Sequence, residues 1–176
     1  LTGRPVDWLT VRMIPDRLRW LVEPGSAPVE LGERFSAAGR QLFLVGGSVR
    51  DAFLARTDAD ADLDFTTDAR PDEIKRIVSE WADAVFTMGE AFGTIGAVKD
   101  DRRLEITTFR SEIYREESRK PHVSYSDTVE EDLSRRDFAV NAMALRIPDA
   151  ELIDPHGGMA DLATGLLRTP LDPHIS

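Results

Sequence analysis

The chain has 176 residues, no cysteine and a formal net charge of −10 at pH 7, with 41% hydrophobic and 31% charged residues. This composition is typical of a soluble globular domain with a hydrophobic core. Without cysteine, a disulfide framework and a thiolate zinc site are excluded. The acidic balance argues against a large basic nucleic-acid surface on this chain. Apolar runs are too short for a membrane span and no export signal is visible, so we expect a cytoplasmic protein with no membrane partner.

Helical and strand-like patterns alternate along the chain. Helices are expected at 16–22, 28–39, 48–55, 71–83, 129–141 and from about residue 160. Strands are expected at 42–45, 62–66, 84–88, 93–98, 103–109, 142–147 and 152–153. A polar turn joins 93–98 to 103–109 and another joins the last two strands, so both pairs are expected to be hairpins, while 111–127 is expected to be a long loop. This pattern predicts an α+β fold around one sheet.

Two carboxylates one residue apart are the first candidate functional group. Asp62 and Asp64 fall on a predicted strand, whose period of two places both on one face, with Leu63 and Phe65 buried on the other. Such a pair suits divalent metal ions that share carboxylate ligands. The alternative is the solvated start of an acidic strand.

A glycine turn between a predicted strand and a predicted helix is the second. Gly46, Gly47 and Ser48 allow backbone amides to approach a phosphate, and Arg50 supplies a cation nearby. The pattern is neither a Walker loop nor a dinucleotide fingerprint. The alternatives are an ordinary tight turn and a structural ion pair between Arg50 and Asp51.

Further polar residues stand in apolar surroundings. Glu105 is expected to be a third carboxylate beside the first two, as a metal ligand or base, or to face solvent. Arg136 and Asp137, which follow Arg135, are expected to hold a ribose hydroxyl and a phosphate, or to cap a helix in water. Asn141 either holds its loop in place or reaches a ligand, because a buried amide must be hydrogen-bonded.

The order of these motifs resembles the class II tRNA nucleotidyltransferases and bacterial poly(A) polymerases of the DNA polymerase beta superfamily. The stretches that carry the resemblance span roughly residues 30–170 and are LVGGSVRD at 44–51, DLDFTT at 62–67, EITTFR at 105–110, DLSRRDFAVNAMA at 132–144 and DPHGG at 154–158. It implies a nucleotidyltransferase head with a small mixed, mostly antiparallel sheet flanked by helices. By domain, it implies an N-terminal extension at 1–27, a catalytic head at 28–153 and the start of a helical neck at 154–176.

The resemblance also implies chemistry: template-independent transfer of a nucleoside monophosphate from CTP or ATP to the 3′-hydroxyl of tRNA by two-metal catalysis, with release of pyrophosphate. Asp62 and Asp64 would bind Mg²⁺, and Glu105 would be the third catalytic carboxylate. Gly47 and Arg50 would hold the triphosphate, Gly46 and Ser48 would shape the turn, and Arg136 and Asp137 would recognise the ribose.

Two other functions stay open at this point. A poly(A) polymerase would add AMP to RNA 3′ ends with the same metal site, and a module that binds nucleotide or metal without turnover belongs to another class. The family's base-reading element, an acidic residue followed by Arg three positions later in the neck, is expected beyond residue 176. The sequence indicates no oligomeric state.

Overall fold

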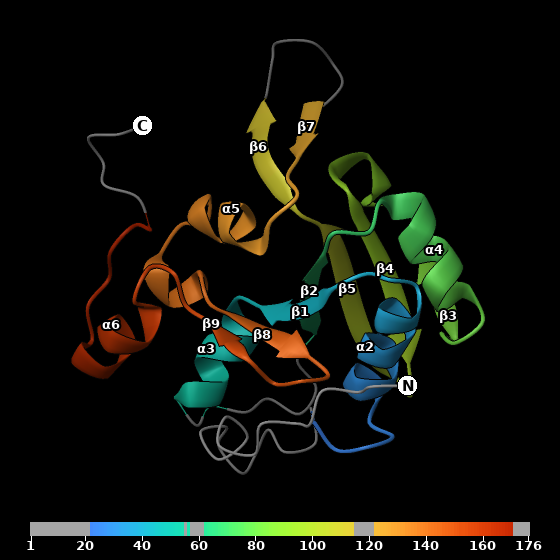
Figure 1. The fold of residues 1–176 in the computed structure, drawn as a ribbon, viewed down its shortest axis with the longest axis horizontal. Coiled ribbons are helices and arrows are strands. Elements are labelled where there is room, and N and C mark those ends of the chain that lie inside the picture. Colours follow the sequence, from blue (N-terminus) through green and yellow to red (C-terminus); the bar gives the residue numbers. More distant parts are fainter. Residues whose placement is uncertain (1–21, 55, 57–61, 115–121, 171–176) are drawn as a thin grey trace.

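The main sheet has seven strands whose order across the sheet differs from their order along the chain (Figure 1). The structure, a computed structural model, describes residues 22–54, 56, 62–114 and 122–170. Across the sheet the strands are β3 (Ala84–Phe86), β4 (Thr94–Lys99), β5 (Arg102–Thr108), β2 (Leu63–Thr67), β1 (Leu42–Val45), β8 (Ala144–Ile147) and β9 (Leu152–Ile153). Of these neighbours, β2 and β5 pair in parallel and the rest pair antiparallel. The predicted α+β fold with a mixed, mostly antiparallel sheet is therefore confirmed.

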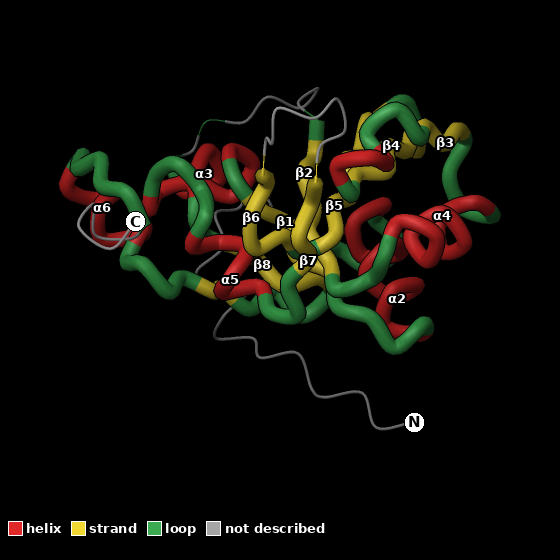
Figure 2. Tube along the Cα trace, turned by 90° about the horizontal axis from the view of Figure 1, so that it is seen from above, coloured by secondary structure: helices red, strands yellow, loops and turns green. Residues whose placement is uncertain are grey.

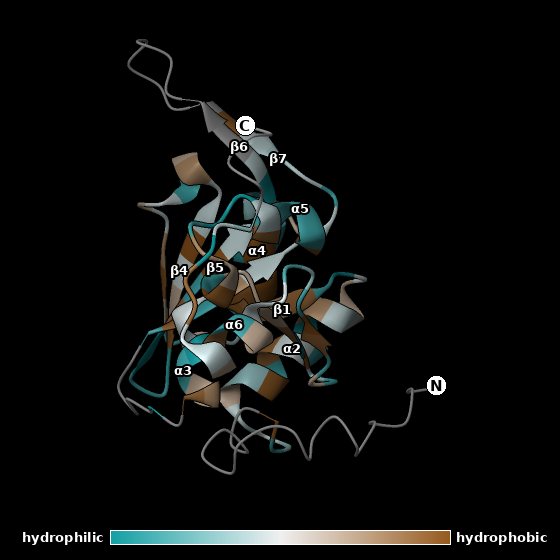
Figure 3. Cartoon of the chain, turned by 90° about the vertical axis from the view of Figure 1, so that its left-hand side faces the viewer, coloured by the Kyte–Doolittle hydropathy of each residue, from teal (hydrophilic) through white to brown (hydrophobic). Residues whose placement is uncertain are grey.

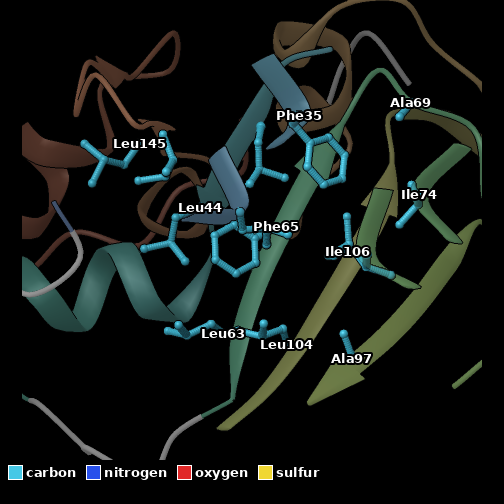
Figure 4. Close-up of a cluster of buried hydrophobic side chains, with 14 of the residues drawn as sticks. Phe35, Leu44, Leu63, Phe65, Ala69, Ile74, Ala97, Leu104, Ile106 and Leu145 are labelled. Carbon is cyan, nitrogen blue, oxygen red and sulfur yellow. The ribbon is translucent and has the colours of Figure 1, made fainter. Parts of the chain in front are cut away.

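One face of this sheet carries the larger hydrophobic core (Figure 4). Alternate residues along the strands point into it, as the period of two requires. Helices α2 (Ala27–Ala37), α3 (Gly47–Phe53) and α4 (Pro71–Ser79) contribute side chains to the same cluster. The strand residues buried there are Leu42, Leu44, Leu63, Phe65, Ile95, Ala97, Leu104, Ile106, Leu145 and Ile147.

The opposite face is covered over only part of its width. Phe43, Val45 and Ala144 form a second cluster with Leu133 of helix α5 (Val129–Ser134), over strands β1 and β8. Figure 3 shows α5 largely in hydrophilic colours, which fits a short helix that buries one side and exposes the other. The remaining part of this face, formed by β2, β5, β4 and β3, is called the open face below.

The residues predicted as a long loop at 111–127 contain a hairpin instead. Strands β6 (Arg110–Tyr114) and β7 (His122–Tyr125) pair with each other in a separate two-stranded sheet that projects from the main sheet (Figures 1 and 2). The sequence prediction failed because a strand pair that is not built into the main core has no clear apolar alternation. Residues 115–121 lie outside the described part of the chain.

The predicted helix at 129–141 is also shorter than expected. Helix α5 ends at Ser134, Phe138 is extended at φ −130° and ψ 147°, and residues Ala139–Asn141 form one 3₁₀ turn, η3. Side-chain hydrogen bonds in this segment compete with helical ones: the carboxylate of Asp137 accepts the N–H of Phe138 at 2.8 Å. The last described helix, α6 (Gly158–Thr164), lies at the opposite end of the molecule from β3 (Figures 1 and 2).

The other predicted elements are confirmed within a few residues, including both hairpins of the main sheet. Residues 1–21 and 171–176 lie outside the described part of the chain. The predicted helix at 16–22, apart from residue 22, and most of the predicted extension at 1–27 therefore stay predictions. The division at 153 between head and neck stays a prediction. No helix in the described ranges has the length and apolar character needed to cross a membrane.

Candidate functional site

Strand pairing brings the predicted site residues together from distant parts of the chain. Leu44 of β1 pairs with Phe65 of β2 in antiparallel register, so the glycine turn that ends β1 lies beside the start of β2. Asp64 pairs in parallel register with Glu105 of β5, which places both side chains on the same face. Val45 pairs with Ala144, so the segment before β8 reaches the same turn. The site therefore lies at the edge of the open face.

The glycine turn has one position that the backbone reserves for glycine. Gly46 adopts φ 72° and ψ −138°, a conformation that side chains disfavour, and helix α3 begins directly after it. Its carbonyl accepts the N–H groups of Val49 and Arg50 at 3.1 Å each. As the first residues of the helix, Gly47 and Ser48 have no helical acceptor for their own N–H groups. Those two amides are thus available to another acceptor.

Gly47 has no such backbone requirement. Its φ is not positive, and an added Cβ would lie 3.5 Å from the Arg50 Nη2 atom, which is ordinary contact. The missing side chain leaves open space next to the Arg50 guanidinium. Ser48 connects this turn to the acidic strand, since its Oγ lies 3.5 Å from the backbone oxygen of Asp62, a long hydrogen bond.

Asp62 and Asp64 are both exposed, while Leu63 and Phe65 between and after them are buried. The predicted alternation is therefore confirmed, although β2 itself begins at Leu63. Partial burial raises the pKa of Asp64, the neighbouring carboxylates of Glu105 and Asp62 raise it further, and Arg136 lowers it. Solvent still reaches the Asp64 side chain, so this pKa shift is smaller than full burial would cause. The three carboxylates form a concentration of negative charge that a cation would relieve.

The carboxylates fit Mg²⁺ only as a partial ligand set. In the part of the chain that the structure describes, no three His, Cys, Asp or Glu side chains are grouped so as to hold a metal ion. A Mg²⁺ site often has one or two carboxylates, with water and substrate phosphates as the other ligands. Asp62 and Asp64 meet that requirement, because no described hydrogen bond or ion pair occupies either side chain. Glu105 then stands as a neighbouring charge rather than as a third protein ligand.

A chain of hydrogen bonds fixes the cationic side of the turn. The Arg50 guanidinium donates through Nε to Asp51 Oδ1 and through Nη1 to Asn141 Oδ1, both at 2.8 Å. The amide nitrogen of Asn141 donates to Asp137 Oδ1 at 3.0 Å. The hydrogen bond from Asn141 lowers the pKa of Asp137, as does the N–H of Phe138. Asn141 thus holds both Arg50 and Asp137 in place. The Arg50–Asp51 ion pair, one of the alternatives that the sequence left open for this turn, is present.

Asp132 is the buried hub of a second network. It is 0% exposed. Its Oδ1 accepts the N–H of Arg110 at 3.0 Å and lies 3.3 Å from Arg135 Nη2, while its Oδ2 accepts Arg136 Nη2 at 3.2 Å. Asp132 is a site residue that was not predicted from the sequence. The available signal was its spacing, because a carboxylate three and four residues before two arginines can meet both on one helical turn.

Arg136 and Asp137 are adjacent in sequence but belong to different parts of the site. Arg136 faces the glycine turn, where its Nη1 lies 3.4 Å from the position that a Gly46 Cβ would take. Asp137 instead lines a cavity of about 370 Å³ together with Arg50, Asn141 and residues of α6 such as Leu162. Arg136 is therefore close to the glycine turn, whereas Asp137 belongs to the neighbouring cavity.

Comparison with known proteins supports the predicted family. The CCA-adding enzyme of Bacillus subtilis (strain 168) is 39% identical over 133 residues, or 75% of this chain and 32% of that enzyme. The crystal structure of the Bacillus stearothermophilus CCA-adding enzyme in complex with CTP matches 81% of this chain and 32% of its own, at 30% identity and a TM-score of 0.67. The structure of the Thermotoga maritima CCA-adding enzyme complexed with tRNA matches 96% of this chain and 36% of its own, at 26% identity and a TM-score of 0.68.

This chain spans about a third of the length of the curated relatives it matches. The family described as the Poly A polymerase head domain matches residues 42–168, which is most of the chain. The resemblance inferred from the sequence is thus confirmed, and the chain belongs to the Poly A polymerase head domain family.

Proposed function

We propose that this chain is the catalytic head of an enzyme that transfers CMP and AMP from CTP and ATP to the 3′-hydroxyl of a tRNA. The observation that carries the proposal is the meeting of a glycine turn, an oriented arginine and two exposed aspartates at one end of β1 and β2. Among the described residues, these aspartates have no hydrogen bond or ion pair through their side chains. Triphosphate chemistry needs these three parts: amides and a cation for the phosphates, and carboxylates for their metal ions.

In the proposed reaction, the RNA 3′-oxygen forms a bond to the α-phosphorus of the nucleotide. The bond from that phosphorus to the bridging oxygen of the β-phosphate breaks, and pyrophosphate leaves. Arg50, the amides of Gly47 and Ser48, and Arg136 would hold the triphosphate and balance the charge on the leaving group. Glu105 would accept the proton of the 3′-hydroxyl, since it lies next to Asp64 on the open face.

Asp62 and Asp64 would hold Mg²⁺, which when bound makes the 3′-hydroxyl more acidic and neutralises charge as pyrophosphate forms. Asp137, held by Asn141, would contact the ribose from the neighbouring cavity, while Gly46 and Ser48 keep the turn in shape. The protein's own contribution is mostly positioning, because two hydrogen-bonded networks hold the ligand-binding side chains before the substrate arrives.

Poly(A) addition is a second candidate, favoured by the match to the Poly A polymerase head domain. It uses the same residues for the same bond changes and differs in the choice of base and in the number of additions. The close relatives named CCA-adding enzymes favour CCA addition.

A primer-extension assay with the full-length protein that contains this chain separates these functions. The substrate is a labelled tRNA that lacks its terminal CCA, with Mg²⁺, CTP and ATP. Addition of two C residues and one A supports CCA addition, and long runs of A support poly(A) polymerase activity. No extension of any RNA, with CTP still bound, would identify a module that binds nucleotide without turnover.

A further inference from the structure

An apolar groove lies on the open face directly beside Glu105. It has a volume of about 480 Å³, and Phe86, Met88, Phe92 and Arg103 line it together with Glu105. The exposed fractions of the three apolar side chains are 44%, 93% and 44%. Large apolar side chains gathered at this level of exposure mark a binding surface rather than a core.

The strand register joins this groove to the acidic pair. Asp64 pairs with Glu105, Glu105 pairs with Gly96, and Gly96 pairs with Phe86, so the four residues form a row across β2, β5, β4 and β3. Gly96 keeps the row open, because a Cβ there would come within 3.4 Å of Phe86 Cβ and narrow the space between Phe86 and Glu105. The groove is therefore a continuation of the candidate site and not a separate pocket.

The geometry of phosphoryl transfer decides which substrate belongs in the groove. The attacking and leaving oxygens stand roughly in line on opposite sides of the phosphorus. The glycine turn, Arg50 and Arg136 lie on the β1 and β8 side of Asp64, so the leaving pyrophosphate is assigned to that side. The attacking hydroxyl must then come from the side of β5, β4 and β3, which lie beyond β2 in the sheet (Figures 1 and 2). The groove lies on that side.

We propose that this groove holds the 3′-terminal nucleotide of the acceptor RNA, with its base against Phe86, Met88 and Phe92. The proposal rests on the proposed function and adds the acceptor subsite to it. Apolar and aromatic side chains bind the face of any base, and this suits an acceptor whose last base changes as the chain grows. Arg103 supplies a cation at the groove, and no described hydrogen bond or ion pair occupies its guanidinium. It is placed to meet the phosphate of the terminal nucleotide.

The test uses the full-length protein and an acceptor RNA with 2-aminopurine as its 3′-terminal base. In wild type, base stacking is expected to quench the fluorescence of this RNA without any added nucleotide. The double variant Phe86→Ala, Phe92→Ala should lose the quenching and raise the KM for RNA roughly tenfold or more, the usual scale for a lost stacking contact. The KM for CTP should stay within about twofold, because the triphosphate lies on the other side of Asp64.

Charge removal gives an independent measurement. Arg103→Ala should weaken RNA binding and reduce the slope of log Kd against log salt by about 0.7, the value for one single-strand phosphate. The matched control is Arg76→Ala, which removes an exposed arginine from α4, a helix that packs on the opposite face of the sheet. This control should leave both the affinity and the salt slope unchanged.

The outcomes separate this assignment from the proposed function. If the wild type transfers no nucleotide to any RNA, the proposed function fails. If the wild type transfers normally and the groove variants keep their RNA affinity and KM, only the groove assignment is overturned. Lower thermal stability of the full-length variants with unchanged RNA KM would assign the groove to a protein contact and would also overturn it.

Discussion

The aspartates of this protein occur in two contrasting environments. Asp62 and Asp64 at the start of β2 are exposed, and no described hydrogen bond or ion pair occupies their side chains. Asp132 on α5 is fully buried and bonded to Arg110, Arg135 and Arg136. Asp132 and the acidic pair lie within the same candidate site. Their difference in burial and hydrogen bonding therefore calls for an explanation other than their position in the fold.

The contrast separates a group that holds other side chains in place from groups that are proposed to bind a ligand. A buried charge needs partners within the protein. A carboxylate that has such partners orients them, but it can no longer bind a ligand. In an exposed group of like charges each carboxylate repels the others, which makes the ionised group unfavourable to the fold. Asp132 therefore stabilises the fold and holds Arg136, whereas Asp62 and Asp64 have the exposure that the proposed metal-binding role requires.

The largest expected effect comes from the acidic pair. Asp62→Ala or Asp64→Ala should lower the rate of nucleotide transfer by at least roughly a hundredfold, the scale of losing one charge-stabilising group at a reacting centre. The midpoint of urea unfolding should not fall, because no hydrogen bond or ion pair within the described residues would be lost with either side chain. Asp149→Ala, an exposed aspartate in the turn between β8 and β9, is the control. Full activity in both variants would refute the metal assignment.

Substitution of Asp132, unlike that of Asp62 or Asp64, should reduce stability. Asp132→Ala leaves three arginines near one another without their carboxylate, so we expect the free energy of unfolding to fall by about 3 kcal/mol. Burial and the neighbouring Arg135 already lower the pKa of Arg110, and Asp132 acts against this, so its loss adds to the cost. Urea titration of the wild type and the variant measures the change.

Asp132→Asn is the companion variant for this position. It keeps an oxygen for the N–H of Arg110 but removes the charge, so its stability should fall between those of wild type and Asp132→Ala. A loss below about 0.5 kcal/mol in Asp132→Ala would mean that water replaces the carboxylate, and the hub would then have no positioning role.

The same contrast explains what the sequence could predict. The alternation of Asp62, Leu63, Asp64 and Phe65 was visible because a strand half buried against a core repeats every two residues. The turn at Gly46 was visible because glycine is favoured where φ is positive. Both are local patterns, and both are confirmed by the structure. The assignment of these residues to substrate and metal remains a proposal.

Long-range contacts were not predictable in this way. Whether Asn141 held its loop or reached a ligand could not be decided until Arg50, far away in sequence, was seen to donate to it. The parallel pairing of β2 with β5 places Glu105 beside Asp64, although their residue patterns would fit an antiparallel pair equally well. The hairpin of β6 and β7 was missed for a related reason, because its strands bond to each other outside the main sheet.

Gly46 and Gly47 allow effects on stability to be separated from effects on nucleotide binding. Gly46→Ala should lower the free energy of unfolding by roughly 1–3 kcal/mol, because alanine is strained at φ 72° and ψ −138°. Gly47→Ala should raise it by up to about 1 kcal/mol, because alanine suits the first turn of α3 and its Cβ would meet Arg50 only at ordinary contact distance. Gly47→Ala should nevertheless raise the KM for CTP severalfold, since its methyl group would occupy the space beside Arg50.

Thermal unfolding and steady-state kinetics of the two variants measure these changes. Here each variant is the control for the other, because one tests backbone strain and the other tests space for a ligand. An unchanged KM for CTP in Gly47→Ala would argue that Gly47 does not approach the triphosphate.

The smallest expected effect is a gain in stability at the acidic pair. Because the pKa of Asp64 is raised in the folded state, the folded protein binds this proton more tightly than the unfolded chain does. Above the folded-state pKa the ionised carboxylate therefore destabilises the fold, and Asp64→Asn should be slightly more stable than wild type at neutral pH without divalent ions. The difference should shrink as pH falls through the folded-state pKa and vanish below the pKa of the unfolded chain.

Added Mg²⁺ should reverse the order, because a ligand that binds only the folded state stabilises it and Asp64→Asn has lost one of the two ligands. Melting temperatures of both proteins across a pH series, with and without Mg²⁺, test the sign of each effect. Asp149→Asn should follow the wild type in every condition, since this exposed turn lies at the opposite end of β1 from the glycine turn. If Asp64→Asn is less stable than wild type in metal-free buffer at neutral pH, the carboxylate has a stabilising partner. The distinction between Asp64 and Asp132 would then be lost.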